Sequence, residues 1–218
     1  MSRKTGAIQA AFGKILKGLP ASLQGSGLLQ YSQFMNCEYN SYMKPQDLLV
    51  ALKFATTTQE HWAYQGLALD LGISTGALHA SVKRLLKSGL LRKEANGIGP
   101  HPRNLEKFLL GGAEFVFPPE YTSLTRGVAT STSAAPLAEH FAQSSETNIV
   151  WPDPEGNLRG IGLKPIYPSA PFAAMNDPGL YELLALFDAL RGGQLREGKI
   201  AQDHIRQILG RLSLSSIR

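Results

Sequence analysis

The sequence predicts a mainly α-helical fold with a small β component. Apolar residues recur at helical spacing in several segments before residue 112 and again after residue 177. Between them, residues 118–178 contain nine of the 13 prolines of the chain. Helices cannot run through most of such a segment, so we expect an irregular region with short strands there. With 218 residues, of which 43% are hydrophobic, the chain can bury one good core or two small ones.

Charge is unevenly distributed between the two halves of the chain. Residues 1–112 carry 13 basic and 6 acidic side chains, a net charge of +7, whereas residues 113–218 carry 9 and 11, a net charge of −2. A phosphate backbone would therefore be attracted to the N-terminal half. The alternative interpretation is that this excess is ordinary solubilising charge.

We expect four parts: a basic arm (1–42), a helical domain with a small hairpin (43–112), an irregular Pro-rich region (113–176) and a C-terminal helical pair (177–218). The first 36 residues contain no acidic residue, and an apolar pattern at near-helical spacing lasts only three turns there. Helices of that length are marginal alone, which favours a poorly ordered arm over a transit peptide or a membrane-surface helix. No apolar run approaches the roughly 18 residues needed to span a bilayer.

Three helices are predicted in the second part. The first covers Lys44 to Thr57, with Pro45 in the first turn, where its missing N–H costs nothing. Its apolar face consists of Leu48, Leu49, Leu52 and Ala55. The second lies around residues 62–71 and stops at Gly72, a residue suited to a left-handed helix end. We expect Trp62 and Tyr64 to pack in its core and not to stack on bases.

The third predicted helix, Ser74 to Lys87, has apolar and polar residues on opposite sides. Its core stripe is Leu78, Val82, Leu85 and Leu86, and its outward positions are Thr75, Gly76, His79, Ala80, Lys83 and Lys87. The Ser74 hydroxyl is expected to cap the first turn. Two helices joined by a short turn that contains glycine form a helix-turn-helix. The outward face is small, polar and basic, which suits a DNA major groove.

A short strand, Leu90 to Lys93, follows this helix, and Asn96-Gly97 is a strong tight-turn signal. Pro100 and Pro102 restrict the next strand, so the hairpin should be small. The segment from Arg103 to Phe117 then predicts a helix that ends at Gly111-Gly112, followed by an apolar strand.

The remaining chain combines short strands with helices. We expect strands at 148–151 and 158–163, in a region that wraps neighbouring helices or a second subunit. Helices are predicted over 179–193, after an Asp177-Pro178 start signal, and over 197–212. Both have apolar stripes that need a partner surface, either the irregular region or a symmetry mate.

The string LALDLGISTGALHASVKRLLKSGLLRK resembles the winged helix-turn-helix core of bacterial transcriptional regulators of the MarR-like type, over about residues 44–110. The sequence departs from that family in its short wing and in lacking long dimer helices on either side of the core. The resemblance implies that four residues read bases, namely Ser74, Thr75, His79 and Lys83. It also implies that four contact phosphates, namely Arg84, Lys87, Arg92 and Lys93. As alternatives, His79 is a solvated polar residue, and Lys83, Arg84 and Lys87 are a solvated basic turn that complements the helix C-terminus.

Signals for chemistry are absent from the sequence. The five histidines are scattered, and no phosphate loop follows a strand. A single cysteine excludes an internal disulfide and favours a cytoplasmic setting. We therefore expect no cofactor, no metal site and no catalytic residues. The Glu139-His140 pair and the Asp153/Glu155 pair are the weak basis for an enzyme in the Pro-rich region.

The favoured function is a sequence-specific regulator that binds double-stranded DNA as a homodimer, because a two-fold protein matches two-fold half-sites. The alternative is an antitoxin-like or adaptor protein, whose winged helix and C-terminal region bind a partner protein. Neither interpretation involves a membrane.

Overall fold

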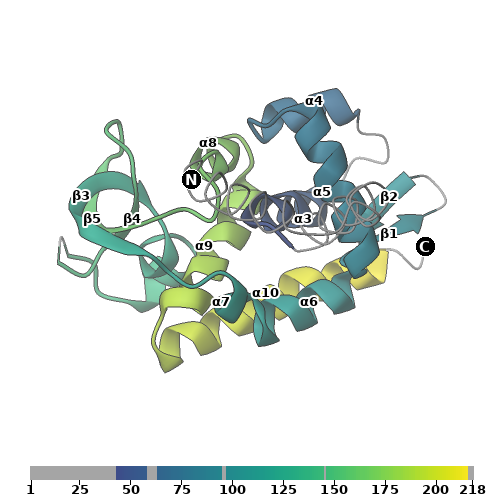
Figure 1. Cartoon of the computed structure of the whole chain (residues 1–218). Helices are drawn as coiled ribbons and strands as arrows, with labels where there is room; N and C mark the ends of the chain where they lie inside the picture. The colour runs from purple at the N-terminus through teal and green to yellow at the C-terminus, as the bar shows by residue number, and fades with distance from the viewer. Residues whose placement is uncertain (1–42, 58–62, 95–96, 145, 216–218) are drawn as a thin grey trace, which may run out of the picture. The chain divides into compact units, whose positions relative to one another are not determined.

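The structure is a computed structural model that describes residues 43–57, 63–94, 97–144 and 146–215, with side chains up to residue 213. The predicted arm and Trp62 lie outside the described residues. The architecture is mainly helical with a small β component, as predicted (Figure 1). The α-helices are α3 (Pro45–Thr56), α4 (Tyr64–Asp70), α5 (Thr75–Ser88), α6 (Pro102–Gly111), α7 (Ala113–Val116), α8 (Ala170–Met175), α9 (Pro178–Gly192) and α10 (Leu195–Ser215). The strands are β1 (Leu91–Glu94), β2 (Gly97–Pro100), β3 (Tyr121–Ala129), β4 (Ile149–Pro152) and β5 (Leu158–Leu163), and short 3-10 turns are η2 (Ser131–Ser133) and η3 (Leu137–His140).

Helix α3 lies at the centre of the helical layer. Pro45 occupies its first turn, and the Asp47 carboxylate accepts a hydrogen bond from the Lys44 N–H at 2.8 Å, which caps the helix start. The predicted apolar face is buried, but so are Val50, Ala51 and Phe54 on other sides of the helix. Helices α5 and α9 and strand β2 all pack against α3, so residues on several sides of this helix are buried and not only those of the predicted face.

Helices α4 and α5 are joined by the predicted turn at Gly72. Gly72 has a φ of 61°, a left-handed conformation that glycine adopts at little cost. The Ser74 hydroxyl accepts a hydrogen bond from the Ala77 N–H at 3.2 Å and caps α5. At the other end Gly89 closes the helix with a φ of 73°. The prediction for 74–87 is therefore confirmed to within one residue.

Strands β1 and β2 form the small antiparallel hairpin that the Asn96-Gly97 signal predicted. Leu91 lies opposite Pro100, and Glu94 lies opposite Gly97. The second strand ends at Pro100 because residue 102 is again a proline, which there begins α6 in a first-turn position.

The segment after Gly111-Gly112 differs from the prediction. Residues 113–116 form the helical turn α7 and not an apolar strand. Ala113 and Phe117, four residues apart, are both buried, and α7 packs against α9. One helical turn places both side chains on the same side, whereas successive residues of a strand alternate between faces.

The Pro-rich region contains a closed three-stranded sheet. The predicted strands are β4 and β5, and β3 pairs antiparallel with both of them, while β4 and β5 pair in parallel. Strand β3 was not predicted. A side chain at Gly127 would lie 2.0 Å from the Trp151 carbonyl oxygen, so this position requires glycine for the strands to approach.

A buried polar network joins this region to α9. The Asp188 carboxylate accepts hydrogen bonds from Thr130 Oγ1 at 2.7 Å, Trp151 Nε1 at 2.6 Å and Arg191 Nε at 2.8 Å. Arg191 Nη2 also donates to the Lys164 carbonyl oxygen at 2.6 Å. Complete burial raises the pKa of Asp188, against the opposing effects of Arg191 and the two other donors. Three distant segments of the chain are thereby joined at one carboxylate.

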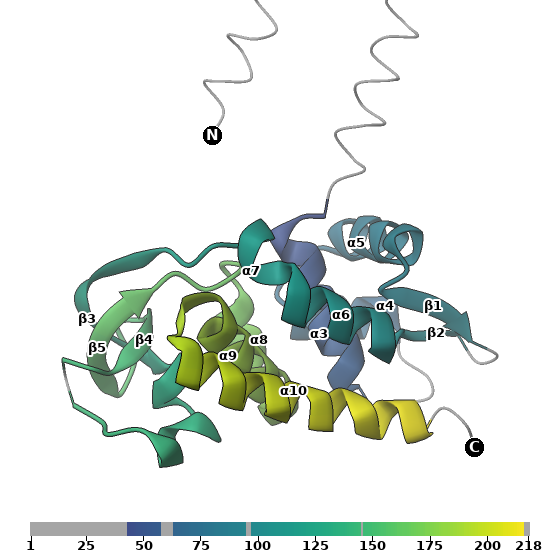
Figure 2. The same ribbon diagram turned by 90° about the horizontal axis from the view of Figure 1, so that it is seen from below.

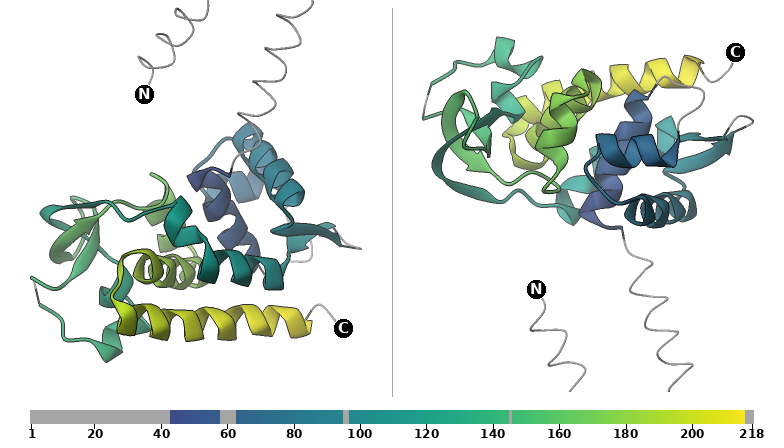
Figure 3. Two further views of the ribbon diagram at one scale, coloured as in Figure 1. Left: turned by 60° about the horizontal axis from the view of Figure 1, so that its bottom comes forward. Right: turned by 90° about the horizontal axis from the view of Figure 1, so that it is seen from above.

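The C-terminal helices pack on the rest of the chain. Helix α9 begins at the Asp177 cap and lies against α3, α7 and α8, and α10 lies along α9 and α6 (Figure 2). The partner surface that their apolar stripes require is therefore mainly α3 and α6. Figure 3 shows α6, α9 and α10 side by side, with β1–β2 and β3–β5 at opposite ends of this arrangement.

The expected domain boundaries near 112 and 176 do not separate compact units. Residues 43–218 form one unit, and one hydrophobic core cluster runs from Leu48 to Leu209. Lys53 Nζ on α3 donates to Asp177 Oδ2 at 2.9 Å, across the boundary predicted at 176.

Candidate nucleic-acid interface

Helix α5 has two faces with different surroundings. Leu78, Ser81, Val82 and Leu85 are buried against the core. The opposite face is solvent-exposed, and its members are the residues that the sequence predicted to point outward: Thr75, Gly76, His79, Ala80, Lys83 and Lys87. The hydrophobic stripe therefore sets the orientation of the helix, and a surface of small, polar and basic side chains is left open.

The N-terminal end of α5 presents free backbone donors to solvent. Ser74, Thr75 and Gly76 are exposed, and apart from neighbouring residues and the backbone of the helix itself, no described atom lies within 4 Å of the place where a side chain at Gly76 would begin. The first N–H groups of a helix and its dipole favour negatively charged groups. One of these donors, the Ala77 N–H, is already used, because it donates a hydrogen bond to the Ser74 hydroxyl that caps the helix. Thr75 and Gly76 thus offer a close approach to a polar ligand.

The His79 ring stacks on Tyr64 of α4. The two ring centroids are 3.9 Å apart with an interplanar angle of 18°. Tyr64 is half-buried against the core, as expected for a packing residue, and burial raises its pKa. Because Tyr64 supports one ring face, the His79 imidazole is held with limited freedom on the exposed side of α5. A held side chain loses less entropy on contact with a ligand.

Arg84 occupies a different place from the one that the resemblance implies. Its guanidinium donates from Nε to Asp47 Oδ2 at 2.7 Å and from Nη2 to Asp47 Oδ1 at 2.6 Å. The Asp47 side chain is fully buried and that of Arg84 is 11% exposed. Arg84 also donates to Ser81 Oγ at 3.2 Å, and the Ser81 oxygen accepts from Gln46. We therefore remove Arg84 from the residues expected to contact phosphate and assign it to the joint between α3 and α5.

The other predicted phosphate residues remain at the surface. Lys87 is exposed on α5, and Lys93 is exposed on β1; Lys83, predicted to read bases, is also exposed on α5. Arg92 Nε donates to Glu94 Oε1 at 3.0 Å, so its charge is partly compensated. The structure thus places α5 next to the hairpin with cations on both elements, and α5 packs against β1.

Helix α6 adds two cations that sequence reasoning did not assign. Arg103 and Lys107 are exposed on the same side as Asn104, whose Nδ2 donates to the Gly89 carbonyl oxygen at 2.8 Å. That bond places the start of α6 beside the end of α5, next to Lys87. The charges in RNLEK were visible in the sequence, but only this tertiary contact relates them to α5.

The two acidic or acid-histidine pairs noted in the sequence, Asp153/Glu155 and Glu139-His140, lie in a turn and on an exposed 3-10 turn. Asp153 Oδ1 accepts a hydrogen bond from the Glu155 backbone N–H at 2.9 Å, as in a turn. Glu139 and His140 are exposed on η3, with the His140 ring 6.5 Å from that of His204. Among the described residues no group of three or more potential ligands could hold a metal ion. Within the same residues, no helix combines the length and apolar character needed to cross a bilayer.

Comparison with protein-family models, with curated proteins and with solved structures found no match to this chain.

Proposed function

We propose that this protein binds double-stranded DNA with the outward face of α5 in the major groove and acts as a sequence-specific transcriptional regulator. The observation that carries the proposal is the composition of this face: it is exposed, contains only small, polar and basic side chains, and lies on a helix whose other face is anchored in the core. The helix order and the hairpin follow the winged helix-turn-helix pattern that the resemblance implies.

The dimensions of α5 suit this role. Its 14 residues correspond to a length of about 21 Å at 1.5 Å per residue. A helix of ordinary diameter enters a major groove about 12 Å wide. In this arrangement Ser74, Thr75, His79 and Lys83 lie toward base edges, with the smallest side chains at the N-terminal end, where recognition helices approach closest.

Phosphate contacts would come from the elements on either side of the groove. Lys87 at the end of α5 and Lys93 on the hairpin carry exposed charge. Arg92 would contact a phosphate by replacing its ion pair with Glu94 with one to the phosphate. Such contacts supply affinity and orientation, whereas base contacts supply discrimination. The short hairpin acts as the wing in this proposal.

The test begins with selection of binding sites from random duplexes, followed by fluorescence anisotropy at several salt concentrations. Lys83→Glu places a negative charge in the groove and is expected to weaken binding at least tenfold. Lys93→Glu removes a proposed phosphate contact and is expected to lower the salt slope by about 1, since roughly 0.9 counterion is released per phosphate contact. Thr75→Ala and His79→Ala are expected to change the preferred site. Arg159→Glu serves as the matched control, because Arg159 is an exposed cation on β5.

Failure of the proposal would be clear from the same experiment. A protein that shows no preference for any selected sequence over random duplex at moderate salt is not a sequence-specific regulator. An Arg159→Glu effect as large as that of Lys83→Glu would show that binding depends on general charge alone. A partner protein that co-purifies with this chain, binds to α5 and prevents DNA binding would support the adaptor function instead.

A further inference from the structure

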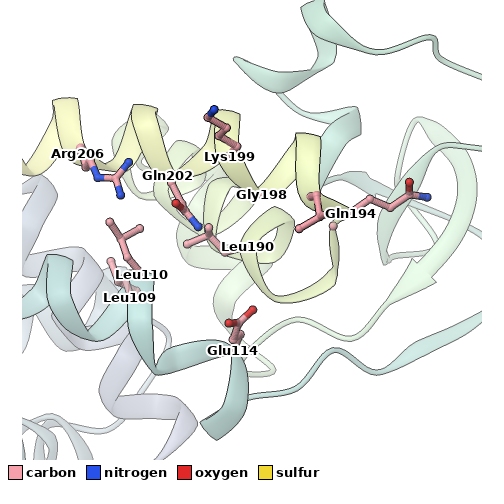
Figure 4. Close-up of a pocket in the computed structure, with 11 residues that line it drawn as sticks. Leu109, Leu110, Glu114, Leu190, Gln194, Gly198, Lys199, Gln202 and Arg206 are labelled. Atoms are coloured by element: carbon pink, nitrogen blue, oxygen red, sulfur yellow. The ribbon is translucent and has the colours of Figure 1, made fainter.

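A groove lies between α6–α7 and the corner that joins α9 to α10. Its volume is about 620 Å³, and Leu109, Leu110 and Leu190 form its apolar floor. Figure 4 shows the two walls: Glu114 rises from α7 on one side, and Lys199 and Gln202 project from α10 on the other. The groove is open to solvent. A small-molecule site usually encloses most of its ligand, so an open groove of this kind is better suited to contact with a protein.

Exposed apolar side chains occur in and beside this groove. Eight large apolar side chains are exposed in the described part of the chain; one of them, Leu195, lines the groove, and two others, Phe115 and Val116, follow the groove residue Glu114 in α7. Leu195 lines the groove and is 96% exposed, and Phe115, which follows Glu114 in α7, is 78% exposed. Tyr121 Oη donates to the Gly192 carbonyl oxygen, next to the groove residue Gly193. Exposed apolar patches of this kind are typical of protein interfaces.

The charges at the rim are opposite and unpaired. Glu114 on α7 and Lys199 on α10 are both exposed, and neither forms an ion pair with a described residue. Arg206, which also lines the groove, is already paired with Asp203 at 3.0 Å. One carboxylate and one ammonium group thus lie on opposite walls of the groove; the Glu114 carboxylate points toward the floor, and the Lys199 side chain points away from it (Figure 4).

We propose that a second copy of this chain occupies the groove in a two-fold symmetric dimer. The surface carries both protruding apolar side chains, Leu195 and Phe115, and the apolar hollow that would receive them. A two-fold axis over the groove brings the α7 wall of one protomer against the α10 wall of its partner, so that Glu114 faces the partner's Lys199 and Lys199 faces the partner's Glu114. This self-complementarity is what an isologous interface requires.

The interface leaves the proposed DNA surface open. The groove lies by α7 and α10, whereas α4 and α5 lie on another side of the 43–218 unit (Figure 1). A dimer built in this way would offer two copies of α5 to two half-sites. The dimer proposal itself does not rest on the proposed DNA-binding function.

Sedimentation velocity of the full chain over a range of concentrations tests this inference. The wild type is expected to sediment as a dimer, with twice the 23.6 kDa mass of one chain. Leu195→Asp should weaken dimerisation about 100-fold, because it places a charge in the partner's apolar hollow. Met175→Asp is the matched control, since Met175 is an exposed apolar side chain on α8, away from the groove. Circular dichroism confirms that each variant is folded.

Charge reversal provides the sharper test. Glu114→Lys and Lys199→Glu should each weaken the dimer at least tenfold, because each creates two like-charge contacts across the axis. The double variant Glu114→Lys/Lys199→Glu restores opposite charges and should dimerise like the wild type. A wild-type monomer at all concentrations, or a double variant as weak as the singles, would overturn the proposal.

The outcomes separate the dimer from DNA binding. A monomeric Leu195→Asp variant should still bind a single half-site with wild-type intrinsic affinity if α5 reads DNA. An intact dimer without DNA binding would refute only the regulator function. A DNA-binding monomer would refute only the dimer.

Discussion

Replacement of Arg84 by alanine is expected to destabilise the fold and not to act primarily on DNA affinity. Arg84 makes two short hydrogen bonds to Asp47, whose side chain is fully buried. Arg84→Ala leaves that carboxylate without its counter-charge inside the core. Removal of one partner of a buried ion pair costs about 3–5 kcal/mol, because the remaining charge is desolvated and uncompensated.

The size of this effect is large enough for a simple assay. For a domain of this length, each kcal/mol lowers the melting temperature by about 2–4 °C, so Arg84→Ala should lower it by roughly 6–20 °C. Urea denaturation followed by circular dichroism gives the free energy of unfolding directly. Lys83→Ala is the matched control, since Lys83 is the exposed neighbour on the same helix, and it should change stability by less than about 0.5 kcal/mol.

A second variant separates the ion pair from the volume of the side chains. Asp47→Leu combined with Arg84→Met removes both charges and keeps apolar volume, so it should recover most of the stability lost in Arg84→Ala. If Arg84→Ala costs less than about 1 kcal/mol and weakens DNA binding as much as Lys93→Ala does, then Arg84 contacts phosphate and our assignment is wrong.

Three further perturbations test the joints of the fold. Ser74→Ala removes the cap of α5 and should cost about 1 kcal/mol in urea denaturation, whereas Ser74→Asp should keep most of the stability. Burial alone would raise the pKa of Asp177, but its hydrogen bonds from the backbone and from Lys53 outweigh burial and hold that pKa below the ordinary 3.8. The contribution of the ionised Asp177 to stability is therefore complete above about pH 4 and is lost as the pH falls below that. The difference in the free energy of unfolding between wild type and Asp177→Asn should shrink in acid. A difference that does not depend on pH would contradict this. Thr130→Val removes one hydrogen bond to the buried Asp188 carboxylate and should cost about 2 kcal/mol, and an unchanged unfolding midpoint would show that the network is not formed.

Local signals in the sequence were sufficient for the helices and the hairpin. Ser74 and Gly89 act at the two ends of α5 through their own side chain or backbone, so the boundaries of this helix depend on residues within it. Asp177-Pro178 likewise starts α9 where predicted. Strand β3 and helix α7 were missed, because their conformations depend on partners elsewhere: β3 is held by β4 and β5, and α7 packs on α9.

Most of the candidate DNA-binding face was also predictable, with one instructive error. The alternation of apolar and polar residues on α5 identifies the outward positions, which include His79 and Lys83. Arg84 lies beside them in the sequence. A side chain at the edge of the helix face can turn inward when it forms an ion pair with a buried carboxylate, as Arg84 does with Asp47. Asp47 is 37 residues away, and no local pattern relates the two residues. The stacking of His79 on Tyr64 depends in the same way on how α4 and α5 meet.

The sequence by itself determined the mainly helical composition, the ends of α5 and α9, and the basic outward face of α5, because capping, periodicity and charge are properties of neighbouring residues. The tertiary structure alone decided that the parts after residue 42 share one core, that most of α3 is buried, and that Arg84 pairs with Asp47. It also assembled the groove between α6–α7 and α9–α10, whose walls are some 80 residues apart in the chain. Such contacts depend on long-range packing, and hydrophobic residues specify only that a surface is buried and not which other surface covers it.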